Sequence, residues 1–179
     1  SFEAIAPGDG GGGTGITLLL SAFGVDLMRA EFAMANGNFP AARDFMLAAF
    51  DKQMAKVQAF LAGRENGADI TFEPTPAEIA AYRAQISADF DAADTEGKWD
   101  IFGEQYLIAH YGNGVEPYNF YRRTLYPTTL QPNREPNPGT FIMSMYYPSN
   151  AVNTNSNISQ KADQTQPVFW DNSGVPPAN

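Results

Sequence analysis

The sequence predicts a mainly α-helical protein, in which tetratricopeptide-like helical hairpins pack with a long irregular C-terminal segment. In the first two thirds of the chain, apolar residues recur at spacings of three and four, which places them on one face of a helix. In the remainder, 9 of the 13 prolines fall within residues 116–179 and interrupt the windows that a helix would need. The charge divides at the same place, because residues 1–115 carry a net charge of −9 and residues 116–179 are neutral.

We expect one α-rich domain over residues 1–179, since this length falls within the usual domain size of roughly 100–200 residues. Within it we expect a glycine-rich loop at 1–15, helices over 16–126 and an irregular packed segment over 127–179. The loop holds six glycines at positions 8–15, but no Gly-Lys-Ser/Thr motif follows them. A flexible connection is therefore favoured over a phosphate-binding loop.

The first two predicted helices form a hairpin. The first helix (16–35) ends at Gly37, and the second (39–61) begins with Asn38 as a cap and Pro40 in its first turn. Helices joined by so short a turn pack antiparallel, and the alternation of small and large residues is typical of a tetratricopeptide-like pair, which needs neighbouring repeats. The two apolar stripes consist of Leu20, Phe23, Leu27, Ala30 and Met34, and of Met46, Phe50, Met54, Val57 and Leu61.

Three further helices are predicted. Thr75-Pro76-Ala77-Glu78 combines a cap, a first-turn proline and a glutamate three residues beyond the cap, so it starts a helix that runs to about Ala93. We expect Asp94-Thr95-Glu96-Gly97 to be non-helical and to separate this helix from the next. The aromatic-rich residues 99–111 form the next helix, and Glu116-Pro117 starts a short final one.

No regular helix is predicted beyond Pro127, because prolines recur too often. Residues 140–147 are predicted to form a short strand or an extended segment, and the asparagine-rich residues 150–157 to form ordered coil. Aromatic and aliphatic side chains along this segment can dock on the helices.

Composition excludes several classes of function. A net charge of −9 argues against a nucleic-acid partner or an anionic membrane surface. The chain has no cysteine and one histidine, His110, so disulfides, thiolate zinc sites and multi-histidine metal centres are excluded, and we expect no cofactor or metal. No apolar run reaches the ~20 residues that span a bilayer, and the N-terminus lacks the pattern of a signal peptide.

Four short motifs follow one another in the second half of the chain. They are Lys98-Trp99-Asp100-Ile101-Phe102, Phe120-Tyr121-Arg122-Arg123-Thr124-Leu125-Tyr126-Pro127, Tyr147-Pro148-Ser149 with Asn153 and Asn157 after it, and Val168-Phe169-Trp170-Asp171. In this order they resemble the C-terminal part of the SusD/RagB family, and the string from Arg122 to Pro127 is the most specific of them. The hairpin at 16–61, with Arg29-Ala30-Glu31, resembles the last tetratricopeptide-like pair of that family.

The resemblance implies a non-catalytic lipoprotein on the outer membrane of Bacteroidetes. Such a protein binds a nutrient, an oligosaccharide or a peptide, at the cell surface and delivers it to a TonB-dependent, SusC-like outer-membrane transporter. Family members are longer and begin with a lipobox cysteine. We therefore expect this chain to be the C-terminal part of a longer protein, attached to the membrane only through an N-terminal lipid anchor that the chain does not include.

The chain departs from the family at one motif. Members usually have an arginine shortly before the Tyr-Pro pair and a glutamate shortly after it, where this chain has Met143 or Met145 and Asn150. Any ion pair between those two positions is absent here.

The predicted ligand contacts are Tyr111, Tyr118 and Tyr126, because they lie near glycine and proline turns that can expose a flat ring for stacking. No catalytic residue is expected. His110 is predicted to be a hydrogen-bonded packing residue, and Glu31 to be an exposed or hydrogen-bonded residue of the hairpin. Trp99 and Trp170 are expected to pack helix against coil, and Arg122 and Arg123 to tie the segment after Pro127 to the helices. The full set of predicted structural residues is Trp99, Arg122, Arg123, Tyr147, Pro148 and Trp170.

Two other functions stay open. A glycosidase needs two carboxylates roughly 5–10 Å apart, and Glu104, Glu116 and Asp171 are the candidates. A tetratricopeptide-like scaffold would bind a protein partner and no small ligand.

Overall fold

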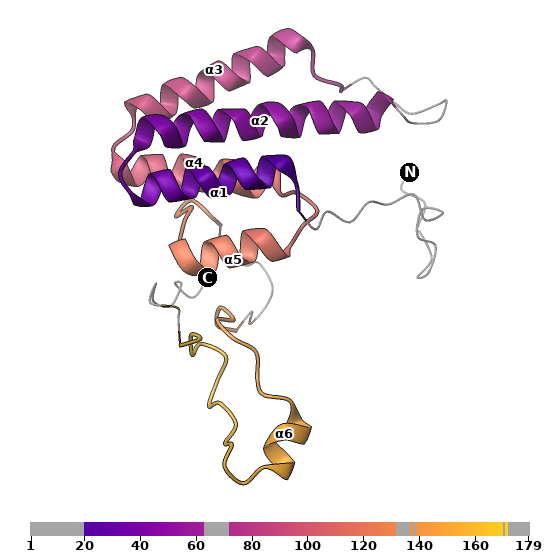
Figure 1. Cartoon of the computed structure of the whole chain (residues 1–179), viewed down its shortest axis with the longest axis vertical. Coiled ribbons are helices and arrows are strands. Elements are labelled where there is room, and N and C mark those ends of the chain that lie inside the picture. Colours follow the sequence, from indigo (N-terminus) through magenta and orange to yellow (C-terminus); the bar gives the residue numbers. More distant parts are fainter. Residues whose placement is uncertain (1–19, 63–71, 132–136, 138, 170, 172–179) are drawn as a thin grey trace.

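The computed structural model describes residues 20–62, 72–131, 137, 139–169 and 171, without the side chains of 60–62 (Figure 1). The glycine-rich loop at 1–15 lies outside these residues. The helices are α1 (Ala22–Ala35), α2 (Phe39–Ala62), α3 (Pro76–Ala92), α4 (Thr95–Ala109), α5 (Val115–Thr124) and α6 (Ser149–Thr154). No strand occurs among the described residues, and the prediction of a mainly α fold built from packed helix pairs is confirmed.

The hairpin of α1 and α2 forms as predicted. Gly37 adopts a φ of 68°, a left-handed conformation that ends α1, and the Asn38 side chain accepts a hydrogen bond from Ala41 N at 3.3 Å at the start of α2. The predicted start of the first helix is wrong at Leu20, which is 70% exposed and outside α1. The reason is Ser21, whose extended backbone and side-chain hydrogen bond to Gly24 N at 3.0 Å cap the helix there.

The start of α3 is the predicted capping box. The Thr75 hydroxyl accepts from Glu78 N at 3.3 Å, and the Glu78 carboxylate accepts from Thr75 N at 2.8 Å. The prediction that residues 94–97 break the chain is wrong beyond Asp94. Asp94 caps α4 by accepting from Gly97 N at 2.9 Å, so α4 begins at Thr95 and its first turn includes the expected break.

The end of α5 directs the chain back across α4. Leu125 adopts a φ of 64° and ends the helix, and the following Tyr126–Pro127 peptide bond is cis. Pro127 is buried on Gly103 of α4, where a Cβ atom would lie 2.8 Å from the Pro127 nitrogen. Only glycine allows this close approach of the two backbones.

The core is aromatic and lies where α1, α2, α4 and α5 meet the second half of α3. The Tyr106 and Phe120 rings stack with centroids 4.2 Å apart, and Phe102 meets Phe120 edge to face at 5.6 Å. Side chains from α1, α2 and α3 complete this cluster, among them Leu27, Met46, Ile86 and Phe90.

Residues 139–169, here called the arm, project away from α1–α5, here called the body (Figure 1). Residues 140–147 form no strand, and their irregular backbone bends at 140 and at 143–144. The prediction of no helix beyond Pro127 is wrong at α6. Its six residues contain no proline, and Pro148 precedes the helix instead of interrupting it. Within the described residues, α6 makes no contact with any helix of the body.

Candidate functional site

The turn between α4 and α5 presents an exposed aromatic ring. Tyr111 is 95% exposed. Its backbone is ordered by hydrogen bonds from Tyr111 N to Ile108 O at 3.2 Å and from Asn113 N to His110 O at 2.8 Å. The Asn113 side chain accepts a further bond from Val115 N at 3.1 Å. Of the three predicted ligand contacts, Tyr111 is the one whose ring is accessible on both faces.

The second predicted contact, Tyr118, attaches the arm to α5. Its ring is half-buried and stacks on Phe141 with centroids 5.6 Å apart, while its hydroxyl donates a hydrogen bond to Ile142 O. The Arg122 guanidinium lies 5.4 Å from the Tyr118 ring centroid. Tyr118 thus has partners in both the helix and the arm.

The third predicted contact, Tyr126, lies against Trp99. The two rings stack with centroids 5.5 Å apart and an angle of 18° between their planes. The Tyr126 hydroxyl donates to the Glu96 carboxylate, and this bond raises the pKa of Tyr126 to about 12. Trp99 also meets Phe102 edge to face at 6.2 Å. Trp99 packs α4 against the segment that follows α5.

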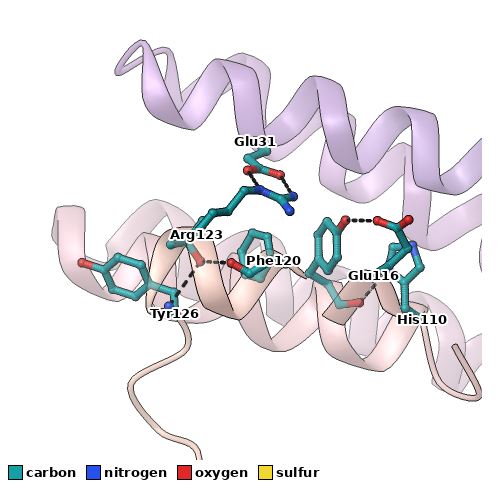
Figure 2. A network of polar contacts seen from close by, with 8 residues as sticks. Glu31, His110, Glu116, Phe120, Arg123 and Tyr126 are labelled. Atoms are coloured by element: carbon teal, nitrogen blue, oxygen red, sulfur yellow. Dashed lines mark hydrogen bonds and ion pairs between the residues drawn. The ribbon is translucent and has the colours of Figure 1, made fainter. Parts of the chain in front are cut away.

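A polar network joins α1 to α5 beside the aromatic core (Figure 2). Arg123 reaches from α5 to Glu31 on α1, and its Nε and Nη2 atoms donate to the two carboxylate oxygens at 2.6 Å each. These bonds raise the pKa of the guanidinium above its ordinary value. The neighbouring Tyr106 hydroxyl is 3.4 Å from the Glu116 carboxylate, and burial raises the pKa of Tyr106 to about 12. Both groups keep their ordinary charge at neutral pH.

His110 ends α4 within this network. Its Nδ1 atom is 3.0 Å from Tyr106 O, so this nitrogen carries the proton and donates it to the carbonyl. The imidazole lies 4.5 Å from the Tyr106 ring and 5.5 Å from the Phe23 ring. Burial lowers the pKa of His110, which favours the neutral ring. His110 is a hydrogen-bonded packing residue in this geometry.

Arg122 holds the arm to the body. Its Nη1 atom donates to Met143 O at 3.0 Å, and its Nε atom lies 3.9 Å from the Asp171 carboxylate. Arg122 therefore ties the irregular segment to α5, whereas Arg123 ties α5 to α1. Trp170, which is predicted to pack helix against coil, lies outside the described residues.

The two legs of the arm are joined by hydrogen bonds. The amides of Met143 and Ser144 donate to Gln164 O at 2.8 and 3.2 Å. The Gln160 side-chain amide pairs with the backbone of Tyr147, accepting from Tyr147 N at 3.0 Å and donating to Tyr147 O at 2.9 Å. Lys161 donates to the Ser144 hydroxyl at 2.6 Å.

The Tyr147-Pro148 motif, whose flanking residues differ from the family pattern, lies on this arm. Met143 is fully buried, whereas Met145 and Asn150 are exposed. Tyr147 and Pro148 are exposed too, and Lys161 Nζ lies 5.1 Å above the Tyr147 ring. A lysine thus approaches the Tyr-Pro pair from the opposite leg of the arm.

The three carboxylates considered for catalysis have separate partners. Glu104 accepts from the Thr129 hydroxyl at 2.7 Å, Glu116 lies beside Tyr106, and Asp171 lies beside Arg122. In the part of the chain that the structure describes, no group of three or more histidines, cysteines or carboxylates could hold a metal ion. No described helix is long and apolar enough to cross a membrane.

A cavity of about 770 Å³ lies elsewhere on the body, between α2, α3 and α4. We call it the α2–α4 groove. Apolar side chains of all three helices line it, together with Gln53, Gln105 and residues 72–75, which precede α3. The Tyr82 ring packs 5.7 Å from Phe50, and its hydroxyl accepts from Gln105 Nε2 at 3.1 Å.

Sequence reasoning missed this groove. Ile79, Tyr82, Ile86 and Phe90 recur at spacings of three and four, a pattern typical of one packed helix face, but only Ile86 and Phe90 are buried. The start of α3 diverges from α2 (Figure 1), which leaves its first two turns to form a wall of the groove. One signal is present in the sequence, because the polar residues 64–74 between the two helices supply enough chain for the helices to separate. Sequence reasoning also missed Asp26, a buried carboxylate that pairs with Arg29 and Lys52.

Comparison with known proteins gives one family. The sequence model of the SusD-like family, described as "Susd and RagB outer membrane lipoprotein", matches residues 13–167. No curated protein and no solved structure matches the chain significantly.

Proposed function

Because the chain belongs to the SusD-like family of outer-membrane lipoproteins, we propose that it captures an oligosaccharide or a peptide and delivers it to a TonB-dependent, SusC-like transporter. The family match over residues 13–167 is the observation that carries this proposal. The family is one of non-catalytic binding lipoproteins of the outer membrane, and it implies nutrient binding with a SusC-type partner. The kind of nutrient and its contacts are the part that we propose.

Binding without catalysis needs a surface that can hold a ligand and release it. Tyr111 supports such a role, because an exposed ring on an ordered turn can stack on a sugar face or an apolar side chain at low entropic cost. We propose Tyr111 as the principal contact. Tyr118 and Tyr126 are half-buried and would contribute through the accessible parts of their rings.

Calorimetry with a panel of oligosaccharides and short peptides tests this proposal. The Tyr111→Ala variant should bind the best ligand about tenfold more weakly, which corresponds to the loss of one aromatic stacking contact. The matched control is Tyr146→Ala, which removes an exposed tyrosine of the arm and should leave the affinity unchanged.

Three outcomes would count against the proposal. Turnover of an oligosaccharide that is lost on neutralising Glu104, Glu116 or Asp171 would indicate a glycosidase. Stable association with the transporter without binding of any saccharide or peptide would indicate a scaffold. Equal affinities for the wild type and Tyr111→Ala would show that Tyr111 is not a ligand contact.

A further inference from the structure

The arm holds a lysine and a tyrosine in close contact. Its residues 139–169 contain two charged side chains, Lys161 and Asp163. The Lys161 ammonium lies 5.1 Å from the centre of the Tyr147 ring, and this tyrosine is 46% exposed. An ammonium is attracted to the face of an aromatic ring. Tyr147 and Lys161 therefore present a positive charge beside an accessible apolar surface.

Gln160 fixes the backbone of both residues. Its Oε1 atom accepts hydrogen bonds from Tyr147 N and from Lys161 N, each at 3.0 Å, and its Nε2 atom donates to Tyr147 O at 2.9 Å. The buried Ser144 hydroxyl accepts from Lys161 Nζ at 2.6 Å and donates to Gln166 O. The lysine and the ring are thus ordered before a ligand arrives, which lowers the entropic cost of binding.

Lys161 forms no ion pair with a carboxylate in the described part of the chain. The other charged residue of the arm, Asp163, accepts instead from the Thr165 amide at 2.8 Å and from its hydroxyl at 2.5 Å. Ser144 accepts from one N–H group of an ammonium that can donate three. A partly buried ammonium without a counter-ion is stabilised by a carboxylate, which brings both a charge and hydrogen-bond acceptors.

This combination of groups favours an acidic sugar as the ligand. The exposed part of the Tyr147 ring can stack on the C–H face of a pyranose. A uronic acid carries its carboxylate on the same sugar ring, within reach of a cation beside the tyrosine. A single lysine balances the single charge of a carboxylate. An anion also meets less repulsion here than on the body, because residues 116–179 are neutral and residues 1–115 carry a net charge of −9.

We propose that Tyr147 and Lys161 bind a uronic acid residue of an oligosaccharide, with the sugar ring stacked on the tyrosine and the carboxylate paired with the ammonium. Gln160 and Ser144 are positioning residues for this site. The inference rests on the proposed capture of a nutrient and names its chemical class, but it uses a contact different from Tyr111.

Calorimetry on the full chain tests this site. The probes are trisaccharides of galacturonic acid and of glucuronic acid, each compared with its methyl ester, which keeps the sugar rings and removes the charge. Lys161→Gln removes the positive charge and keeps a hydrogen-bond donor for Ser144, whereas Lys161→Arg keeps both. The matched control, Arg83→Met, removes one positive charge from an exposed ion pair of the body.

We expect the wild type to bind one of the acids about tenfold more tightly than its ester, with an affinity that falls as salt is added. Lys161→Gln should lose this preference by weakening the acid alone. Lys161→Arg and Arg83→Met should retain it. Tyr147→Ala should weaken the acid and the ester alike, because the ring stacks on both. All four variants should show the circular dichroism of the wild type.

Equal affinities of the wild type for acid and ester would overturn this inference, while a loss of binding in Tyr111→Ala would still support the proposed function. A preference for the acid that survives in Lys161→Gln would place the anion elsewhere and also overturn it. Equal weakening of acid and ester in Lys161→Gln would show that the lysine only shapes the arm.

A peptide arm of the experiment tests the other source of a carboxylate. Tighter binding of a tripeptide acid than of either uronate, lost in the tripeptide amide and in Lys161→Gln, would overturn the assignment to a sugar. If no saccharide and no peptide binds the wild type, both this inference and the proposed function are wrong.

Discussion

The body and the arm are ordered by different interactions. In the body, large side chains such as Phe102, Tyr106 and Phe120 are almost completely buried among five helices. In the arm, only Met143 and Ser144 are buried among the described residues, and the two legs are held by hydrogen bonds between backbone and amide groups. Apolar burial stabilises the body cooperatively, whereas the arm depends on a few anchors at its base. We therefore expect the arm to unfold locally while the tightly packed body stays folded.

The largest expected effect is at the centre of the body. Phe102→Ala removes a fully buried ring that contacts Trp99, Tyr106 and Phe120, so it should lower the free energy of unfolding by about 3–5 kcal/mol. Urea unfolding followed by circular dichroism measures this change. Tyr146→Ala in the arm is the comparison and should stay within about 0.5 kcal/mol of the wild type. Similar losses in both variants would contradict the difference between the two regions.

A smaller effect is expected at the ion pair between α1 and α5. Arg123→Met leaves the Glu31 carboxylate, which is mostly buried, without its two hydrogen bonds, and should cost about 1–2 kcal/mol. The control is Arg83→Met, since Arg83 pairs with Asp51 on the exposed surface and such pairs contribute about 0–1 kcal/mol. Thermal and urea unfolding compare the two. If Arg83→Met proves the more damaging change, the assigned role of Arg123 is wrong.

The body should also respond to acid through His110. Burial lowers its pKa below the ordinary value of 6.5, so the unfolded chain takes up a proton more readily than the folded one. The resulting stability is fully present above pH 6.5 and is lost as the pH falls through the lower folded pKa. Urea unfolding at pH 7 and at pH 5 measures the loss. His110→Gln keeps a polar side chain without the titration, and its stability should change less between the two pH values.

The smallest effect on global stability is expected at the base of the arm. Arg122→Met removes the hydrogen bond to Met143 O and should raise the hydrogen-exchange rates of the Met143 and Ser144 amides about tenfold. Amides of α1 and α4 should keep their rates, which provides an internal control. Faster exchange throughout the body would show that the arm and the body unfold together.

Sequence reasoning predicted the features that depend on neighbours in the chain. The turn at Gly37 and the capping box at Thr75 are local patterns, and the structure has both. The first turn of α4 was misjudged because Asp94 can either end one helix or cap the next, and only packing decides between them.

The remaining features depend on residues far apart in the chain. Arg123 and Glu31 are separated by 92 positions, so the sequence around either residue does not indicate its partner. The α2–α4 groove arises because α3 diverges from α2, and a helical stripe contains no information about the angle at which its helix packs. Tyr118 and Phe141 likewise meet only because the base of the arm packs against α5. Sequence patterns alone therefore could not predict these contacts.

The position of α6 has a practical use. Among the described residues it touches no helix of the body, it lies at the end of the arm remote from α1–α5 in Figure 1, and the turn after it, at 155–157, is exposed. Exposed loop tips of this kind accept inserted sequence with little effect on the fold. An epitope tag or a fluorophore placed there would label the protein on living cells, and its distance to a second label on the proposed transporter partner would test whether the two proteins come together.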